Sequence, residues 1–193
     1  MFITMNIQFF ITSILLGVGL AMDASAVSMA NGLNESKMKI NKILLIAFMF
    51  GFFQALMPLI GYLLGHAILE LIETFIPWIA LILLGFIGGK MLYEGIKNDE
   101  ESEVKALTFK VLVVQAIATS IDALSVGFTF ADYLIIEALL ACGIIAFVTF
   151  IICVLSVYIG KKFGDKLGNK AEILGGIILI GIGLEIFITG LFF

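Results

Sequence analysis

Two aspartates lie within long apolar segments of the sequence, and the residues that follow them are related. Asp23 stands in GLAMDASAVSMANG and Asp122 in ATSIDALSVGFTFA, and both segments contain the pattern D-A-x-x-V. A carboxylate near the centre of a bilayer costs about 2.5 kcal/mol or more to insert, so such residues are rarely retained without a function. Two aspartates at matching places in one chain predict a cation site.

The side chains near the two aspartates carry hard oxygen atoms. Thr119 and Ser125 each stand three residues from Asp122, which would place all three on one face of a continuous helix. Ser28 and Asn31 follow Asp23 along the first apolar segment. Hydroxyl and carboxylate oxygens suit magnesium, calcium or manganese, whereas thiolate and imidazole favour zinc or copper. We therefore expect a hard divalent cation.

Soft ligands are few and badly placed for such a site. The single histidine, His66, is expected at an outer helix end as a solvated side chain. Cys142 and Cys153 share one apolar segment, and their spacing on a helix is too long for a disulfide. Small buried hydrophobes are the expected role of both cysteines.

Three other polar residues occur inside apolar segments. Gln54 precedes Pro58 by four residues, so the proline is expected to interrupt the helix and free the Gln54 carbonyl. Gln54 is thus a ligand or gate candidate, or a bridge between helices. Lys90 is expected to extend to the cytoplasmic surface. Glu185 either receives the ion or a proton, or is a neutral buried acid.

The composition is that of a membrane protein. Of 193 residues, 62% are hydrophobic and 13% are charged, with a mean hydropathy of +1.19. A soluble domain has about 45–50% apolar and about 25% charged residues, so a hidden soluble enzyme domain is excluded. Lipid offers no partners to the backbone, so unbroken apolar runs must form helices. The expected fold is all-α and polytopic.

The apolar residues group into six stretches, each as long as the roughly 17–25 residues that cross a bilayer as a helix. A linker at 97–110, with the acidic run 99–103 as a solvated connector, separates two three-helix repeats at 1–96 and 111–193. The six predicted spans are Ile7–Leu33, Ile43–Ile68, Pro77–Gly95, Val111–Ala131, Ile135–Gly160 and Ile173–Phe193.

The first stretch has an alternative interpretation as a cleaved signal peptide, because Ala24, Ser25 and Ala26 have the small-x-small form of a cleavage site. No positive charge precedes it, and its apolar run exceeds the roughly 7–15 residues of a signal core. The related motif around Asp122 also favours Asp23 as part of the mature protein.

Lysine indicates the orientation in the membrane, because loops rich in lysine and arginine face the cytoplasm. The chain has no arginine, and apart from Lys90 its lysines fall between spans one and two, three and four, and five and six. Both termini are therefore expected on the outer side. The loop lysines are Lys37, Lys39, Lys42, Lys97, Lys105, Lys110, Lys161, Lys162, Lys166 and Lys170.

Three spans in each half mean that the halves enter the membrane from opposite sides, as in the inverted repeats of many secondary transporters. The same spacing along the sequence separates Gly65 from Gly160 and Ile87-Gly88 from Ile182-Gly183, as expected for residues at equivalent positions of two repeats. At about 1.5 Å of rise per residue, both aspartates fall within roughly 10 Å of the midplane. They can therefore face each other where the repeats meet.

These motifs resemble those of the MntP-type manganese efflux pumps. The similar segments are AMDASAVS, GFFQALMPLIG, GGKML, ATSIDALSVG and AEILGGIILIGIG, which extend over essentially the whole chain. The resemblance implies a bacterial inner-membrane exporter that lowers cytoplasmic manganese, with Asp23 and Asp122 as its central residues. Gln54 matches a position where the family can carry glutamate, whereas Glu185 stands where the family varies.

The resulting hypothesis is alternating access, in which Mn²⁺ is a transported substrate, no cofactor is needed and protons return through the carboxylates. Export of another cation or of a cationic amino acid is the main alternative, since the family is related by fold to lysine exporters. An intramembrane aspartyl protease would also need two membrane aspartates, but no GxGD-type motif surrounds either one. A non-transporting scaffold would tolerate replacement of both.

Overall fold

The computed structural model describes residues 7–64, 76–97, 107–130, 133–167 and 170–192. All regular structure in these ranges is helical, which confirms the predicted fold class. The acidic run 99–103 and His66 lie outside the described residues. The helices are α1 (Ile7–Asn34), α2 (Ile40–Leu64), α4 (Ile76–Lys97), α5 (Phe109–Ala118), α6 (Asp122–Thr129), α7 (Ile135–Leu167) and α8 (Lys170–Phe192).

The described helices include several that are long and apolar enough to cross a membrane. α1, α2 and residues 135–164 of α7 are three such helices, and α5 with α6 makes a fourth if the bent pair is one span. α4 and α8 occupy the third and sixth predicted spans. The chain is thus a multi-pass helical membrane protein, while the count of six spans stays a prediction.

Two predictions about helix continuity were wrong. The fourth predicted span is not one helix, because α5 ends at Ala118, α6 begins at Asp122 and their axes differ by 47°. Conversely, α2 continues through Pro58 without interruption. The proline removes one backbone donor, but the buried packing on both sides keeps the helix continuous.

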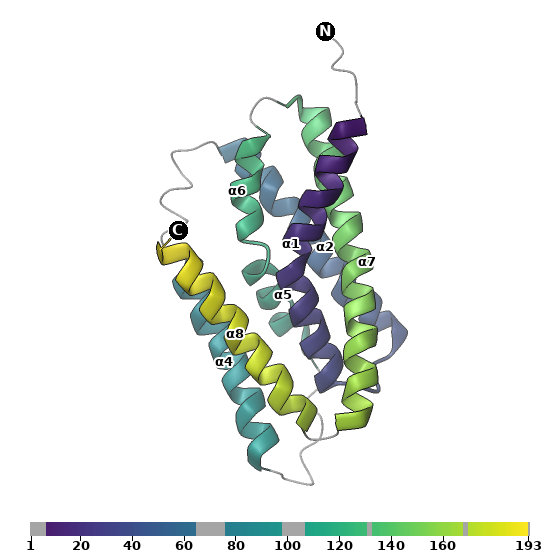
Figure 1. The fold of residues 1–193 in the computed structure, drawn as a ribbon, viewed down its shortest axis with the longest axis vertical. Coiled ribbons are helices and arrows are strands. Elements are labelled where there is room, and N and C mark those ends of the chain that lie inside the picture. Colours follow the sequence, from purple (N-terminus) through teal and green to yellow (C-terminus); the bar gives the residue numbers. More distant parts are fainter. Residues whose placement is uncertain (1–6, 65–75, 98–106, 131–132, 168–169, 193) are drawn as a thin grey trace.

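The helices pack mainly as pairs that join the first half of the chain to the second. α1 packs against α7, α4 against α8, and α2 against both α7 and α6. Figure 1 shows α4 and α8 on one side of the bundle, α1, α2 and α7 on the other, and α5 and α6 between them. Contacts between α1 and α2, and between α7 and α8, are sparse by comparison.

Glycines allow the closest of these crossings. A Cβ added to Gly32 of α1 would lie 2.4 Å from the Val157 carbonyl oxygen of α7, and one added to Gly160 would lie 2.2 Å from the Met29 oxygen. At the other end of the bundle, Gly127 of α6 would meet α2 in the same way. In lipid, such close backbone approach supplies much of the packing attraction between helices.

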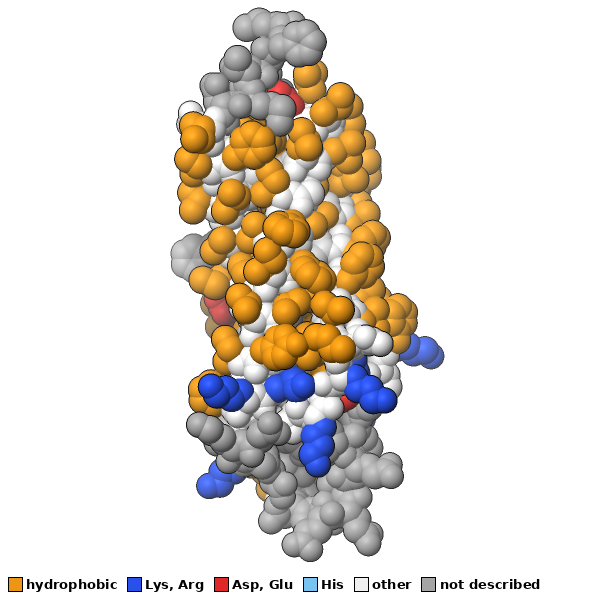
Figure 2. All heavy atoms as spheres, turned by 90° about the vertical axis from the view of Figure 1, so that its right-hand side faces the viewer, with side chains coloured by type: hydrophobic (Ala, Val, Ile, Leu, Met, Phe, Trp, Pro, Cys, Tyr) orange, Lys and Arg blue, Asp and Glu red, His pale blue; other side chains and the backbone are white. Residues whose placement is uncertain are grey.

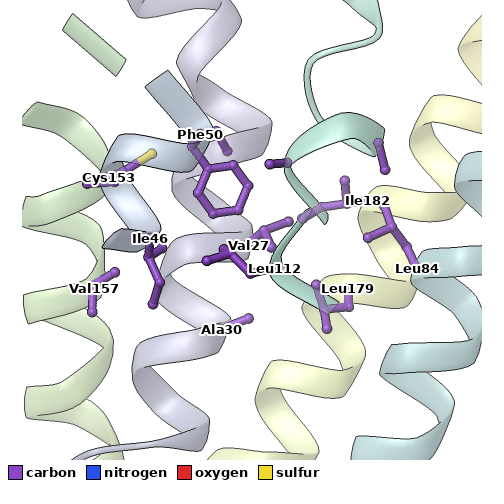
Figure 3. Packing of buried hydrophobic residues seen from close by; sticks show 14 of the residues in the cluster. Val27, Ala30, Ile46, Phe50, Leu84, Leu112, Cys153, Val157, Leu179 and Ile182 are labelled. Carbon is purple, nitrogen blue, oxygen red and sulfur yellow. The ribbon is translucent and has the colours of Figure 1, made fainter. Parts of the chain in front are cut away.

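An apolar cluster fills the centre of the bundle. Its fully buried members include Val27, Phe50, Leu112 and Leu179, which come from α1, α2, α5 and α8. Figure 3 shows these side chains converging from several helices. We call the set of Val27, Ala30, Phe50, Leu84, Leu112, Leu179 and Ile182 the central apolar cluster.

The surface divides into an apolar belt and a basic end. Large apolar side chains such as Phe86 (74% exposed) and Phe147 (66%) cover the outside of the helices, where lipid would contact them. Figure 2 shows the lysines gathered toward one end of the molecule, below this belt. We call this the lysine end. The first described residues of α1 lie at the opposite end (Figure 1).

Candidate metal site

Asp122 is the first residue of α6, immediately after the break between α5 and α6. Its Oδ1 accepts a hydrogen bond from the backbone N–H of Ala123 at 2.9 Å, and its side chain is exposed. The position places the carboxylate at the N-terminus of a helix, where negative charge is stabilised. Half-helix termini of this kind bind charged groups in transporters with broken helices.

The break itself is formed by two hydroxyl side chains. Thr119 Oγ1 donates to the Gln115 carbonyl at 3.0 Å, and Ser120 Oγ donates to the Ala116 carbonyl at 2.7 Å. Hydroxyls that bond back to the preceding turn compete with the helix ladder and bend it. The sequence analysis missed this feature, although the Thr-Ser pair just before an acidic residue is a typical signal for a helix start.

Asp23 lies within the continuous helix α1 and is half-buried. Its carboxylate is close enough to Asp122 for the two charges to repel, and Glu185 of α8 acts on Asp23 in the same way. The structure therefore brings the two aspartates and Glu185 into electrostatic range from three separate helices. Like charges held this close attract a multivalent cation, which relieves their repulsion.

The acidic side chains do not form a complete metal centre by themselves. No group of three or more His, Cys, Asp and Glu side chains is arranged to hold a metal ion within the described residues. An ion at the aspartates would thus have at most two acidic ligands. Neutral oxygens or water must complete the six or more oxygen ligands that hard cations prefer.

Gln54 of α2 supplies one such neutral oxygen. Its side chain is fully buried, and Nε2 donates to the Leu20 carbonyl of α1 at 3.0 Å. Oε1 has no hydrogen-bond partner among the described residues. Because Leu20 precedes Asp23 by less than one turn of α1, this hydrogen bond places the Gln54 amide at about the same level of the bundle as the aspartate. A buried acceptor without a partner is costly, so a bound water or ion is its expected complement.

Thr149 of α7 is another buried polar side chain with an oxygen that lacks a partner within the described helices, and it was not predicted as a site residue from the sequence. It is fully buried, and its Oγ1 lacks a hydrogen-bond partner in the described part of the chain. The offset that relates Gly65 to Gly160 also relates Gln54 to Thr149. That offset is the signal that could have identified it.

The remaining predicted ligands are distributed unevenly. Ser125 is exposed on α6 one turn from Asp122, as expected for a shared helix face. Thr119 is fully buried on the other side of the break, so the prediction of one continuous face with Asp122 was wrong. Ser28 is also fully buried, on the face of α1 that lies beside Cys153 of α7.

The two charged residues of α4 and α8 are both exposed. Lys90 is exposed on α4, which agrees with a side chain that extends to the surface. Glu185 is exposed as well, so it is not enclosed by the described helices, and its role in transport stays a prediction. Its proximity to Asp23 keeps it a candidate for receiving the ion or a proton.

Replacing Gln54 with methionine is expected to weaken Mn²⁺ binding while leaving the fold intact. Methionine has nearly the same shape and removes the amide donor and the unpaired oxygen together, while the Leu20 carbonyl keeps its place in the helical hydrogen bonds of α1. We expect the dissociation constant for Mn²⁺ to rise about tenfold, as for one lost oxygen ligand. Titration of purified protein would measure it, and unchanged affinity would remove Gln54 from the site.

A bundle of long apolar helices that carry acidic side chains on separate helices defines a multi-pass membrane protein. The chain belongs to the family described as "Putative manganese efflux pump", whose sequence profile matches residues 37–187. This match covers the broken helix, α2, α4, α7 and most of α8.

Individual relatives extend the similarity over the whole chain. A protein of Ruminiclostridium cellulolyticum named "Putative manganese efflux pump MntP" is 50% identical over 182 residues, covering 93% of this chain and 96% of the relative. A Methanosarcina mazei protein of the same name is 46% identical over 177 residues, covering 92% and 95%. One from Clostridium perfringens is 46% identical, covering 90% and 91%. No solved structure matches the chain.

Proposed function

We propose that this chain exports manganese(II) from the cytoplasm across the cell membrane. The observation that carries the proposal is membership of this family, in a chain whose two halves contribute Asp23 on α1 and Asp122 on α6. Two carboxylates balance the two positive charges of Mn²⁺ and so reduce the free-energy cost of holding the ion away from water. The Gln54 amide oxygen is the proposed neutral ligand beside them.

The proposed transport mechanism is alternating access between two inverted repeats at 1–96 and 111–193. The helix pairing supports it, because the first helix of each repeat packs against the second helix of the other. The third helices, α4 and α8, pack against each other. This is the pattern expected of two halves related by a two-fold axis in the membrane plane.

The direction of transport follows from the proposed topology. The lysine end, at which α1 ends, is assigned to the cytoplasm, and both termini to the outer side. Mn²⁺ would enter from the lysine end, exchange water for carboxylate oxygens and leave at the opposite end. Protons returning through the same carboxylates, with Glu185 as an outer acceptor, would complete the cycle.

Flux measurements in proteoliposomes test the proposal. Vesicles containing the purified protein are offered Mn²⁺, Ca²⁺, Cd²⁺ or lysine, with and without a pH gradient. We expect saturable Mn²⁺ flux that exceeds Ca²⁺ and Cd²⁺ flux, with no lysine flux, because the site offers hard oxygen ligands and two negative charges. Lysine transport without Mn²⁺ transport would replace the proposal with a cationic amino acid exporter. Absence of flux together with cleavage of a transmembrane peptide would indicate a protease instead.

A further inference from the structure

A reciprocal pair of amide side chains connects α1 to α5 in the centre of the bundle. Asn31 Nδ2 donates to Gln115 Oε1 at 2.9 Å, and Gln115 Nε2 donates to Asn31 Oδ1 at 3.3 Å. The two residues are 4% and 1% exposed. α1 and α5 are not among the closely packed helix pairs of the described chain. The two long amides therefore bridge helices whose backbones are not in close contact.

The amide pair lies between the aspartates and the lysine end. Asn31 follows Asp23 on α1 and Gln115 precedes Asp122 on α5, each by about two helical turns, or roughly 10–12 Å along the helix. On α1 this direction leads to Lys37 and on α5 to Lys110. Any ion that moves from the lysine end to the aspartates along these two helices must pass this pair.

The surroundings of the amide pair are sealed. Val27, Ala30 and Leu112 of the central apolar cluster flank it in sequence on α1 and α5 and are at most 2% exposed. By contrast, Asp122 is exposed and Asp23 is half-buried. The structure is therefore closed on the lysine side of the aspartates and more accessible at the aspartates themselves.

We infer that Asn31 and Gln115 form the cytoplasmic gate of the transport path, an inference that rests on the proposed function. A neutral amide pair suits this role, because its hydrogen bonds exclude a hydrated cation when they are made. When the pair separates, the two amide oxygens become free and can replace water around the entering ion. A charged pair at this depth would be harder to separate and would bind the cation itself.

Thiol labelling from the two sides of the membrane tests this gate. In a background of Cys142→Ala and Cys153→Ala, the variant Thr119→Cys places a reporter one turn beyond Gln115 toward Asp122. A membrane-impermeant thiol reagent is applied to vesicles of either orientation. With the amide pair intact, we expect slow labelling from the cytoplasmic side. Adding Gln115→Ala removes both hydrogen bonds of the pair and should raise that rate by about tenfold or more.

Two further variants separate a gate from a general structural role. Exchanging the amides, Asn31→Gln with Gln115→Asn, keeps a reciprocal pair of the same total length, so labelling should stay near the slow rate. The double variant Asn31→Ala with Gln115→Ala should match Gln115→Ala alone, because the pair acts as a unit. Unchanged cytoplasmic labelling, or an equal rise from both sides, would overturn the gate. The labelling needs no Mn²⁺, so its outcome does not depend on which ion the protein transports.

Discussion

Replacing Asp122 with asparagine is expected to abolish manganese export. Asparagine keeps the shape of the side chain but removes one of the two charges that offset Mn²⁺, leaving the site with a net positive charge when occupied. Its oxygen can still accept the Ala123 N–H bond, so α6 should form normally. Cells that depend on this exporter should lose manganese tolerance to the level of cells without it, at normal amounts of protein in the membrane.

A matched charge removal elsewhere provides the control for this variant. Glu137 lies in the first turn of α7, where it accepts the Leu134 N–H at 3.0 Å. Glu137→Gln also removes one acid and preserves that bond, and we expect full tolerance. Asp23→Asn should behave as Asp122→Asn does. Tolerance retained by either aspartate variant would refute a site that needs both charges.

Replacing Gly127 with alanine is expected to cause a large loss of stability. A Cβ there would lie 2.2 Å from the Pro58 carbonyl oxygen and 2.8 Å from the Gly61 Cα, and neither backbone can move without separating α6 from α2. Overpacking of a tight contact costs about 1–3 kcal/mol. For a chain of this length, we expect the unfolding temperature in detergent to fall by up to about 12 °C.

Gly19→Ala is the control for this effect, because a Cβ added there meets nothing within 4 Å. Alanine favours helix over glycine by about 1 kcal/mol, so Gly19→Ala should leave the unfolding temperature unchanged or slightly raised. Similar losses in both variants would mean that the α2–α6 contact is not the tight crossing described above.

Most of the fold could be predicted from the sequence, because lipid leaves an apolar segment few alternatives to a helix. The span predicted at Ile7–Leu33 corresponds to α1 at Ile7–Asn34, and Pro77–Gly95 corresponds to α4 at Ile76–Lys97. The break before Asp122 was not predicted, because hydropathy does not register two hydroxyls that bond to their own backbone. The continuity of α2 through Pro58 depends on packing that composition cannot describe.

The candidate site was predictable where charge in an apolar segment identifies it. Asp23, Asp122 and Glu185 stand out for that reason, and the structure brings them into electrostatic range. Asn31 was noted only as an oxygen group near Asp23, and neither its pairing with Gln115 nor the hydroxyl of Thr149 was predicted, because uncharged polar residues are common in membrane helices. Their interest arises from burial and from the partners they have or lack, which only the fold determines.

The most direct test of the central claim is the binding of Mn²⁺ to purified protein, measured by the electron paramagnetic resonance signal of the free ion. The claim is that Asp23 and Asp122 form one shared site for the transported ion. We expect one Mn²⁺ to bind per chain in the wild type, and Asp23→Asn, Asp122→Asn and the double variant to lose that binding to the same extent. Wild-type binding that persists in the double variant would contradict the claim.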